Sequence, residues 1–242
     1  MTSVPNPPWR KTRKPVKPPL SQEAIVDVGL RIVDAEGLDG LSMRRVAQEL
    51  DTGPASLYAH VSNKDELIEL IYEKVLGEIV LPEADPANWQ EQLRAYARQA
   101  HAVIAAHADL SKATLAKIPT GPNALRLGEY MYGLLIEAGL PPLDASLGMD
   151  RISLYIASDA FEGSQHYAHM RAAGITSPDD YMKHLLEQIG GYYRSLPPEM
   201  FPYMTGNLDA LVEPNGEDRF EFGLDLLIAG LEMRLARMRE SF

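Results

Sequence analysis

One stretch of the sequence, between residues 41 and 64, combines features that could place a helix against nucleic acid. It predicts two short helices joined by a three-residue turn at 51–53, a spacing typical of a helix-turn-helix unit, whose second helix enters the DNA major groove. Four apolar side chains would close a small core between these helices: Val46, Ala47, Leu50 and Leu57. Mostly small residues remain on the outward side, where they would let the backbone approach base edges: Pro54, Ala55, Ser56, Tyr58 and Ala59.

The position of Lys64 also indicates contact with nucleic acid. Asn63 and Glu66 have the capping-box spacing that begins a helix, so Lys64 would lie in the first helical turn. A cation is unfavourable there because of the helix macrodipole. A contribution to stability alone therefore does not explain why a lysine stands at this position. A phosphate bound at that helix N-terminus does explain it. We therefore expect Lys64 to contact a DNA phosphate.

A second set of residues that could bind a ligand lies on one predicted helix. Glu162, His166 and His169 are spaced four and three residues apart, so that one face of the helix could bind a divalent cation. A solvated or inter-helical polar face has the same spacing, and we favour that interpretation. The chain has no cysteine, no glycine-rich phosphate loop, no two-histidine zinc motif and no nucleophile–base signature. We expect neither a metal, nor a cofactor, nor enzymatic activity.

Charge is distributed unevenly along the chain. Residues 1–80 hold 10 Lys and Arg against 12 Asp and Glu, a net charge of −2, whereas the rest carries −9 of the total of −11. The first 20 residues contain six prolines and the basic residues Arg10, Lys11, Arg13, Lys14 and Lys17. DNA would attract this end and repel the remainder. The arm itself is interpreted either as a solvated tail or as an additional minor-groove contact.

Helical periodicity dominates the chain after residue 20, and no segment shows the alternation of a strand. We expect an all-α protein whose longest irregular segment, 195–216, contains four prolines. The predicted helices span about 22–36, 43–50, 54–60, 64–80, 88–107, 109–117, 123–138, 144–172, 178–194 and 217–239.

Two motifs of this sequence resemble a known family. The run LSMRRVAQEL at 41–50, followed by LYAHVSNK at 57–64, is similar to the N-terminal domain of the TetR family of transcriptional regulators, over roughly residues 21–80. The run FGLDLLIAGLE at 222–232 resembles the last dimerisation helix of the tetracycline-repressor subgroup. Members usually have Ser or Thr where Gly53 stands, and glycine is the weaker N-cap.

The resemblance implies three parts and a set of DNA contacts. The parts are a flexible basic arm at 1–20, a helix-turn-helix domain with its connecting helix at 21–80, and a helical effector-binding and dimerisation domain at 81–242. A boundary at 81–86 with two prolines agrees with this division. By position, Arg44 would contact a base, where a guanidinium suits guanine O6 and N7. Pro54, Ala55 and Ser56 would face the bases, and Tyr58, His60 and Lys64 would contact phosphates.

In this family the core of the C-terminal domain contains the ligand cavity. The candidate lining residues, each of which an ordinary core explains equally well, are Tyr130, Met131, Leu134, Tyr155 and Phe161. Leu115 and Ile118 stand near two metal-binding positions of the tetracycline repressor, so magnesium–tetracycline binding is not expected. An apolar stripe is interpreted either as internal core or, as the resemblance favours, as half of an intersubunit four-helix bundle with 144–172: Leu224, Leu227, Ile228, Leu231 and Leu235.

These features together predict a ligand-responsive repressor that binds a pseudo-palindromic operator as a homodimer and is released by a small-molecule effector. The alternatives are a helical adaptor or an enzyme on the same scaffold without operator binding. We expect a cytoplasmic protein, because the first 20 residues lack the apolar core of a signal peptide and no apolar stretch approaches roughly 18 residues.

Overall fold

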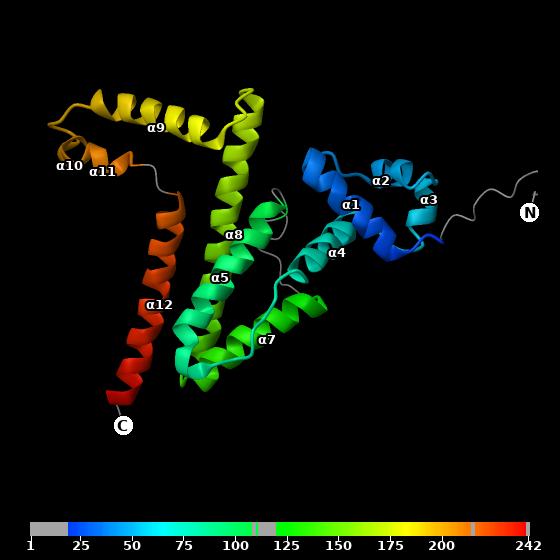
Figure 1. Ribbon diagram of the computed structural model, residues 1–242, viewed down its shortest axis with the longest axis horizontal. Coiled ribbons are helices and arrows are strands. Elements are labelled where there is room, and N and C mark those ends of the chain that lie inside the picture. The colour runs from blue at the N-terminus through cyan, green and yellow to red at the C-terminus, as the bar shows by residue number, and fades with distance from the viewer. Residues whose placement is uncertain (1–18, 108–109, 111–119, 214–215, 241–242) are drawn as a thin grey trace, which may run out of the picture.

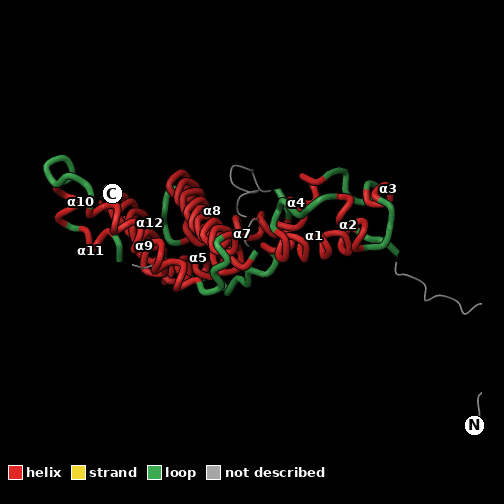
Figure 2. The backbone as a smooth tube through the Cα atoms, turned by 90° about the horizontal axis from the view of Figure 1, so that it is seen from above, coloured by secondary structure: helices red, strands yellow, loops and turns green. Residues whose placement is uncertain are grey.

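The computed structural model describes residues 19–107, 110, 120–213 and 216–240. Within these ranges the regular structure is helical and contains no β-strand, as the all-α prediction requires (Figure 2). The basic arm and nearly all of the helix predicted at 109–117 lie outside the described residues. None of the described helices is long and apolar enough to cross a membrane.

The observed helices follow the predicted periodicity, with differences at two helix ends and in one segment predicted to be irregular. The third helix stops at Leu57 and the fourth at Leu76, both earlier than predicted. The segment 195–216 is not wholly irregular, because Pro202 begins a short helix at a position where proline needs no hydrogen-bond partner. The elements are α1 (Gln22–Glu36), α2 (Met43–Glu49), α3 (Pro54–Leu57), α4 (Lys64–Leu76), η1 (Pro86–Asn88), α5 (Trp89–Ala106), α7 (Pro122–Glu137), α8 (Pro142–Ala172), α9 (Pro178–Arg194), α10 (Pro202–Gly206), α11 (Leu208–Leu211) and α12 (Gly216–Glu240).

Side-chain caps fix the starts of several helices. The hydroxyls of Ser21 and Ser42 accept bonds from backbone N–H groups three residues later, each at 3.1 Å. Asn63 accepts from the Glu66 N–H at 2.9 Å, as the capping-box spacing predicts. The Glu66 carboxylate accepts a bond from the N–H of Ser62, one residue before the cap, and hydrogen bonding by the Ser62 side chain and backbone lowers the pKa of Glu66.

The helices form two hydrophobic clusters. The N-terminal group, α1–α4, surrounds a cluster of its own, and α5, α7, α8 and α12 surround a larger central cluster (Figure 1). Tyr72 of α4 and Val103 of α5 pack against both clusters, and Leu110 is buried in the cluster of the N-terminal group. The two groups are therefore joined by shared apolar contacts.

A reciprocal cap joins α4 to α7. The Glu73 carboxylate accepts bonds from the N–H groups of Asn123 and Ala124 at the start of α7, where a negative charge also suits the helix dipole. Gly121 leaves room for this carboxylate, since a Cβ there would collide with it. In the other direction, Arg126 donates to the Ile79 carbonyl at 3.0 Å, just beyond the end of α4.

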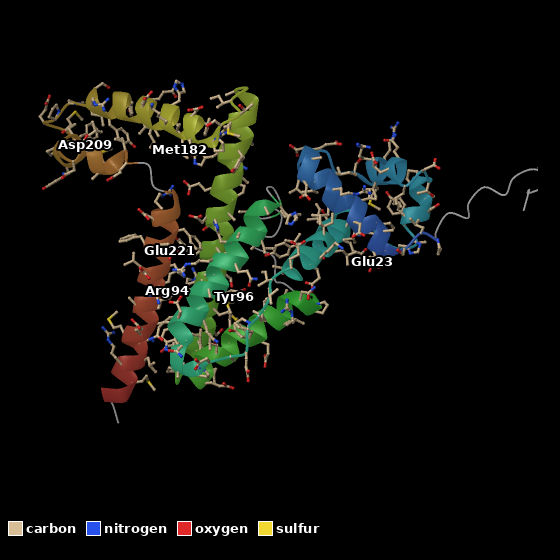
Figure 3. All side chains as sticks on the ribbon, viewed as in Figure 1. Glu23, Arg94, Tyr96, Met182, Asp209 and Glu221 are labelled. Atoms are coloured by element: carbon tan, nitrogen blue, oxygen red, sulfur yellow. The ribbon has the colours of Figure 1, made fainter. Side chains whose placement is uncertain are left out.

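The C-terminal helix α12 packs along α8 and α5. Arg94 bonds Asp225 at 2.9 Å and Arg98 bonds Glu221 at 2.7 Å; Figure 3 shows Arg94 and Glu221 in the space between α5 and α12. The apolar stripe predicted for an intersubunit bundle lies mostly inside the chain itself: Leu224, Ile228, Leu231 and Leu235 are buried in the central cluster. The preference for an intersubunit position of this stripe was wrong, because α5 and α8 of the same chain already cover it.

Helices α9–α11 extend from the far end of α8, on the side opposite the N-terminal group (Figures 1 and 2). Ser177 caps α9, accepting from the Asp180 N–H at 3.2 Å. The tip of this projection is strongly exposed, as the 71% and 85% exposure of Met200 and Tyr203 indicates.

Removing the Glu73 cap should destabilise the junction between α4 and α7. Glu73→Ala leaves two N–H groups at the start of α7 without their carboxylate, and we expect the free energy of unfolding to fall by about 1–2 kcal/mol. Urea unfolding followed by circular dichroism measures this change. Glu129→Ala, which removes an exposed carboxylate from α7, is the control. Equal stability of the two variants would contradict the capping role of Glu73.

Candidate nucleic-acid interface and ligand cavity

Backbone contacts hold α2 and α3 in a fixed arrangement. Asp51 adopts a left-handed conformation with φ of 48°, which aspartate tolerates better than most residues. The Thr52 N–H then donates to the Ala47 carbonyl at 2.9 Å and closes the turn. Pro54 takes the first position of α3, and Gly53 supplies no side-chain cap. Leu57 is completely buried, so that α3 is fixed by a single side chain in the N-terminal cluster.

The residues predicted to face DNA bases are accessible. Pro54, Ala55 and Ser56 are exposed, and so are Tyr58 and Arg44; His60 is half-buried. The exit of α3 is also held in place, because the Gln22 amide at the start of α1 donates to the His60 carbonyl at 3.0 Å. The short helix thus presents an exposed surface from a well-anchored backbone.

Two neighbouring arginines on α2 have different surroundings. Arg45 is held by the carboxylates of Glu36 at 2.9 Å and Glu49 at 2.5 Å, and these bonds raise its pKa. Arg44 is exposed and forms no ion pair with any described residue. Its guanidinium therefore keeps its donors available, as the predicted base contact requires.

Lys64 has a partner that the sequence did not reveal. Its ammonium group donates to the Leu38 carbonyl at 3.1 Å, and its side chain is half-buried. The inference that stability alone does not explain this lysine was wrong, because the bond links the start of α4 to the segment between α1 and α2. Its phosphate contact stays a prediction.

A cavity of about 290 Å³ lies between α5, α8, α9 and α12. Small residues form one wall and leave the space open: Ala105, Ala160 and Gly163. Larger side chains that also line the cavity include Met170 of α8 and Tyr181 and Met182 of α9. A Cβ added at Gly163 would meet no atom within 4 Å. The cavity can accommodate a small, largely apolar molecule.

Most polar groups around this cavity are already paired within the protein. His101 of α5 contacts Asp159 of α8 at 2.8 Å, and its ring lies 4.4 Å from that of Phe220. Arg219 of α12 contacts Glu162 of α8 at 3.1 Å, and this bond raises the pKa of Arg219. Because these polar groups bond one another, the cavity offers mainly shape and apolar contact to a ligand.

The polar face predicted on α8 is divided by the cavity. Glu162 and His166 line it, with 3.9 Å between the His166 Nε2 and a Glu162 oxygen, whereas exposed His169 is not among its lining residues. The His166 Nδ1 atom is buried without a hydrogen-bond partner. Across the described ranges, no three or more His, Asp or Glu side chains are arranged to hold a metal ion.

None of the five predicted ligand-contacting residues lines this cavity. Met131 and Leu134 of α7 are buried in the central cluster, and the Tyr130 hydroxyl is 3.2 Å from Gln92. Tyr155 donates to the Phe220 carbonyl at 2.9 Å, and Phe161 is half-buried on α8. The sequence analysis missed His101, Tyr181 and Arg219, which come from three separate helices and share no local pattern.

Comparisons with known proteins match both parts of the chain. The family described as "Bacterial regulatory proteins, tetR family" matches residues 25–71, and "Tetracyclin repressor-like, C-terminal domain" matches residues 81–235. The HTH-type transcriptional repressor DrrR1 of Streptomyces coeruleorubidus is 31% identical over 239 residues, covering 96% of this chain and 85% of its own length. The class D tetracycline repressor protein of Escherichia coli is 25% identical over 222 residues, covering 90% and 92% respectively.

Solved structures of ActR from Streptomyces coelicolor are similar to this chain over nearly its full length. Apo ActR superposes with a TM-score of 0.80 and 38% sequence identity, over 91% of this chain and 98% of ActR. ActR in complex with actinorhodin gives a TM-score of 0.78 and 39% identity, over 88% and 96%.

The bond from Lys64 to Leu38 should contribute to stability without any DNA. Lys64→Ala removes it and leaves a carbonyl to find another donor, so we expect the free energy of unfolding to fall by about 1 kcal/mol. Thermal and urea unfolding of the protein alone measure this effect. Lys183→Ala, an exposed lysine on α9, serves as the control. If both variants are as stable as the parent protein, the Leu38 bond has no energetic role.

Proposed function

The chain belongs to the TetR family of bacterial regulatory proteins, and on this basis we propose that it is a ligand-responsive repressor that binds a pseudo-palindromic operator as a homodimer. The single observation that supports this most is the exposed start of α3, anchored beside Arg44, which forms no ion pair with any residue that the structure describes. A small-molecule effector in the cavity between α5, α8, α9 and α12 releases the DNA.

The DNA contacts divide into two kinds. Arg44 and Ser56 can donate hydrogen bonds to base edges, while Pro54 and Ala55 offer only apolar contact, for example with a thymine methyl group. Tyr58, His60 and Lys64 contact phosphates and set the register of the protein on the duplex. Lys64 exchanges or shares its Leu38 bond when a phosphate is present.

A second apolar face of α12 supports the homodimer. Phe222, Leu226 and Met233 are 67%, 60% and 52% exposed, although other residues of the same helix are buried in the central cluster. On α8, Leu147 and Leu154 are also exposed, at 52% and 39%. A second copy of the chain covers these faces in a four-helix bundle of α8 and α12 from each subunit. Two-fold symmetry then places the recognition helices roughly 34–36 Å apart, in successive major grooves.

The cavity accounts for the response to a ligand. ActR, whose fold this chain shares, has been solved in complex with actinorhodin, which is therefore the first compound to test. A ligand that prefers the dimer with a different separation of the two recognition helices lowers DNA affinity. It does so only to the extent of its differential affinity for the two conformations.

Base recognition is tested at Arg44. A DNA duplex is first selected from a random library by the parent protein, and Arg44→Ala is then titrated against all single-base variants of it. We expect discrimination to fall by roughly 1–3 kcal/mol at one base pair in each half-site, because one bidentate contact is lost. Arg194→Ala, an exposed arginine on α9, should leave the whole profile unchanged. An unaltered profile for Arg44→Ala would remove this residue from base readout.

The effector site is tested by filling the cavity. Gly163→Leu adds a side chain into open space and improves helix propensity, so the protein should remain folded and bind the selected duplex. Actinorhodin affinity, measured by calorimetry, should fall at least about tenfold because the added side chain occupies ligand space. Gly128→Leu on α7 also meets open space but lies outside the cavity, and is the matched control. Equal actinorhodin affinity in the two variants would place the ligand elsewhere.

A further inference from the structure

His107, at the C-terminal cap of α5, contacts two carboxylates of the segments around the N-terminal cluster. Its Nδ1 lies 2.8 Å from an oxygen of Asp34 on α1, and its Nε2 lies 3.6 Å from an oxygen of Glu78, just beyond the end of α4. The imidazole side chain is only 13% exposed. One side chain at the end of α5 thus contacts α1 and the segment that directly follows α4.

The chemistry of the pair fixes the role of each nitrogen. A carboxylate only accepts hydrogen bonds, so Nδ1 carries the proton that is donated to Asp34. The distance of 3.6 Å between Nε2 and Glu78 is too long for a hydrogen bond. Because the ring is mostly buried, water competes less for the Asp34 bond than it does at an exposed pair.

Helix α5 connects this contact directly to the cavity. His101 and Ala105 of α5 line the cavity. They lie six and two residues, respectively, before His107, which caps the end of the same helix. Val103 packs against both hydrophobic clusters, and Leu110, three residues after His107, is buried in the N-terminal cluster. The end of α5 is therefore anchored in the N-terminal group on two sides of His107.

The reciprocal cap between α4 and α7 is less suited to report on the cavity. Glu73 and Arg126 also join the two groups, but no residue of α7 lines the cavity. A molecule that displaces α5 acts on His107 through one rigid helix, whereas it reaches α7 only through further packing.

We propose that His107 is a positioning residue that fixes the orientation of the N-terminal group on α5, and that it transmits displacement of α5 by a bound effector to the DNA-binding helices. The orientation is a property of the chain alone. The transmission rests on the proposed function, since it requires an effector and an operator.

The orientation is tested with spin labels, which the absence of native cysteine makes straightforward. Cysteines replace two exposed residues, Ala59 after α3 and Glu137 at the end of α7, and labelled protein is diluted with unlabelled protein. We expect His107→Ala to broaden the distance distribution measured by pulsed electron paramagnetic resonance. His107→Asn should restore a narrow distribution, because its amide N–H lies near the place of Nδ1. His107→Gln places the amide toward Glu78, so it should narrow the distance distribution less than His107→Asn does.

The matched control is His184→Ala, which removes an exposed histidine of α9 bonded to Gln188. Its distance distribution should equal that of the parent. If His107→Ala also equals the parent, His107 does not hold the N-terminal group, and the proposal is overturned whatever the protein binds.

The transmission is tested with the selected duplex and with actinorhodin as the probe. In His107→Ala, each separate affinity should stay within about threefold of the parent, while the loss of DNA affinity caused by actinorhodin shrinks at least about fivefold. A merely structural role would weaken both affinities and leave their coupling unchanged, and an unchanged coupling overturns the transmission. If the parent binds neither duplex nor actinorhodin, the proposed function fails, while the spin-label distances still decide the role of His107.

Discussion

The structure depends on how two hydrophobic clusters are joined into one molecule. A three-helix unit as small as α1–α3 buries little apolar surface by itself, and α4 completes its core while leading into the rest of the chain. Tyr72, Val103 and Leu110 extend this packing across the junction. Around them, Glu73 caps α7 and His107 meets Asp34. Because these polar bonds surround shared apolar contacts, the position of α3 is tied to the helices that form the cavity.

The arrangement of charges separates three surfaces by chemistry. Two carboxylates form ion pairs with Arg45 near α3, whereas Arg44 forms none with a described residue. The hydrogen-bond donors of Arg44 are therefore available to another partner, although those of its neighbour are not. In the cavity, His101 bonds Asp159 and Arg219 bonds Glu162, so these polar groups are already paired and the surface selects mainly by shape. On α12, Phe222, Leu226 and Met233 are exposed apolar side chains. The proposed DNA-contacting surface, the cavity and the proposed subunit interface therefore use different residues.

Local structure was largely predictable from the sequence. The helices predicted to begin at about residues 22, 43 and 64 are capped by Ser21, Ser42 and Asn63, and Pro54 begins α3. The family resemblance also followed from two short stretches of chain, at 41–64 and 222–232. These features depend on bonds between residues a few positions apart and on helical periodicity, both of which the order of amino acids contains directly. The ends of α3 and α4 were less accurate, since fraying and turn geometry decide them.

Tertiary structure alone decided which face of each helix meets which neighbour. The apolar stripe of α12 was visible in the sequence, but its burial inside the chain depends on α5 and α8. The partner of Lys64 is a carbonyl 26 positions away, and His107 meets residues of two other segments. The cavity lies where His101, Gly163, Tyr181 and Arg219 converge. A void of this kind results from the crossing of helices far apart along the chain, and no local pattern of residues encodes it.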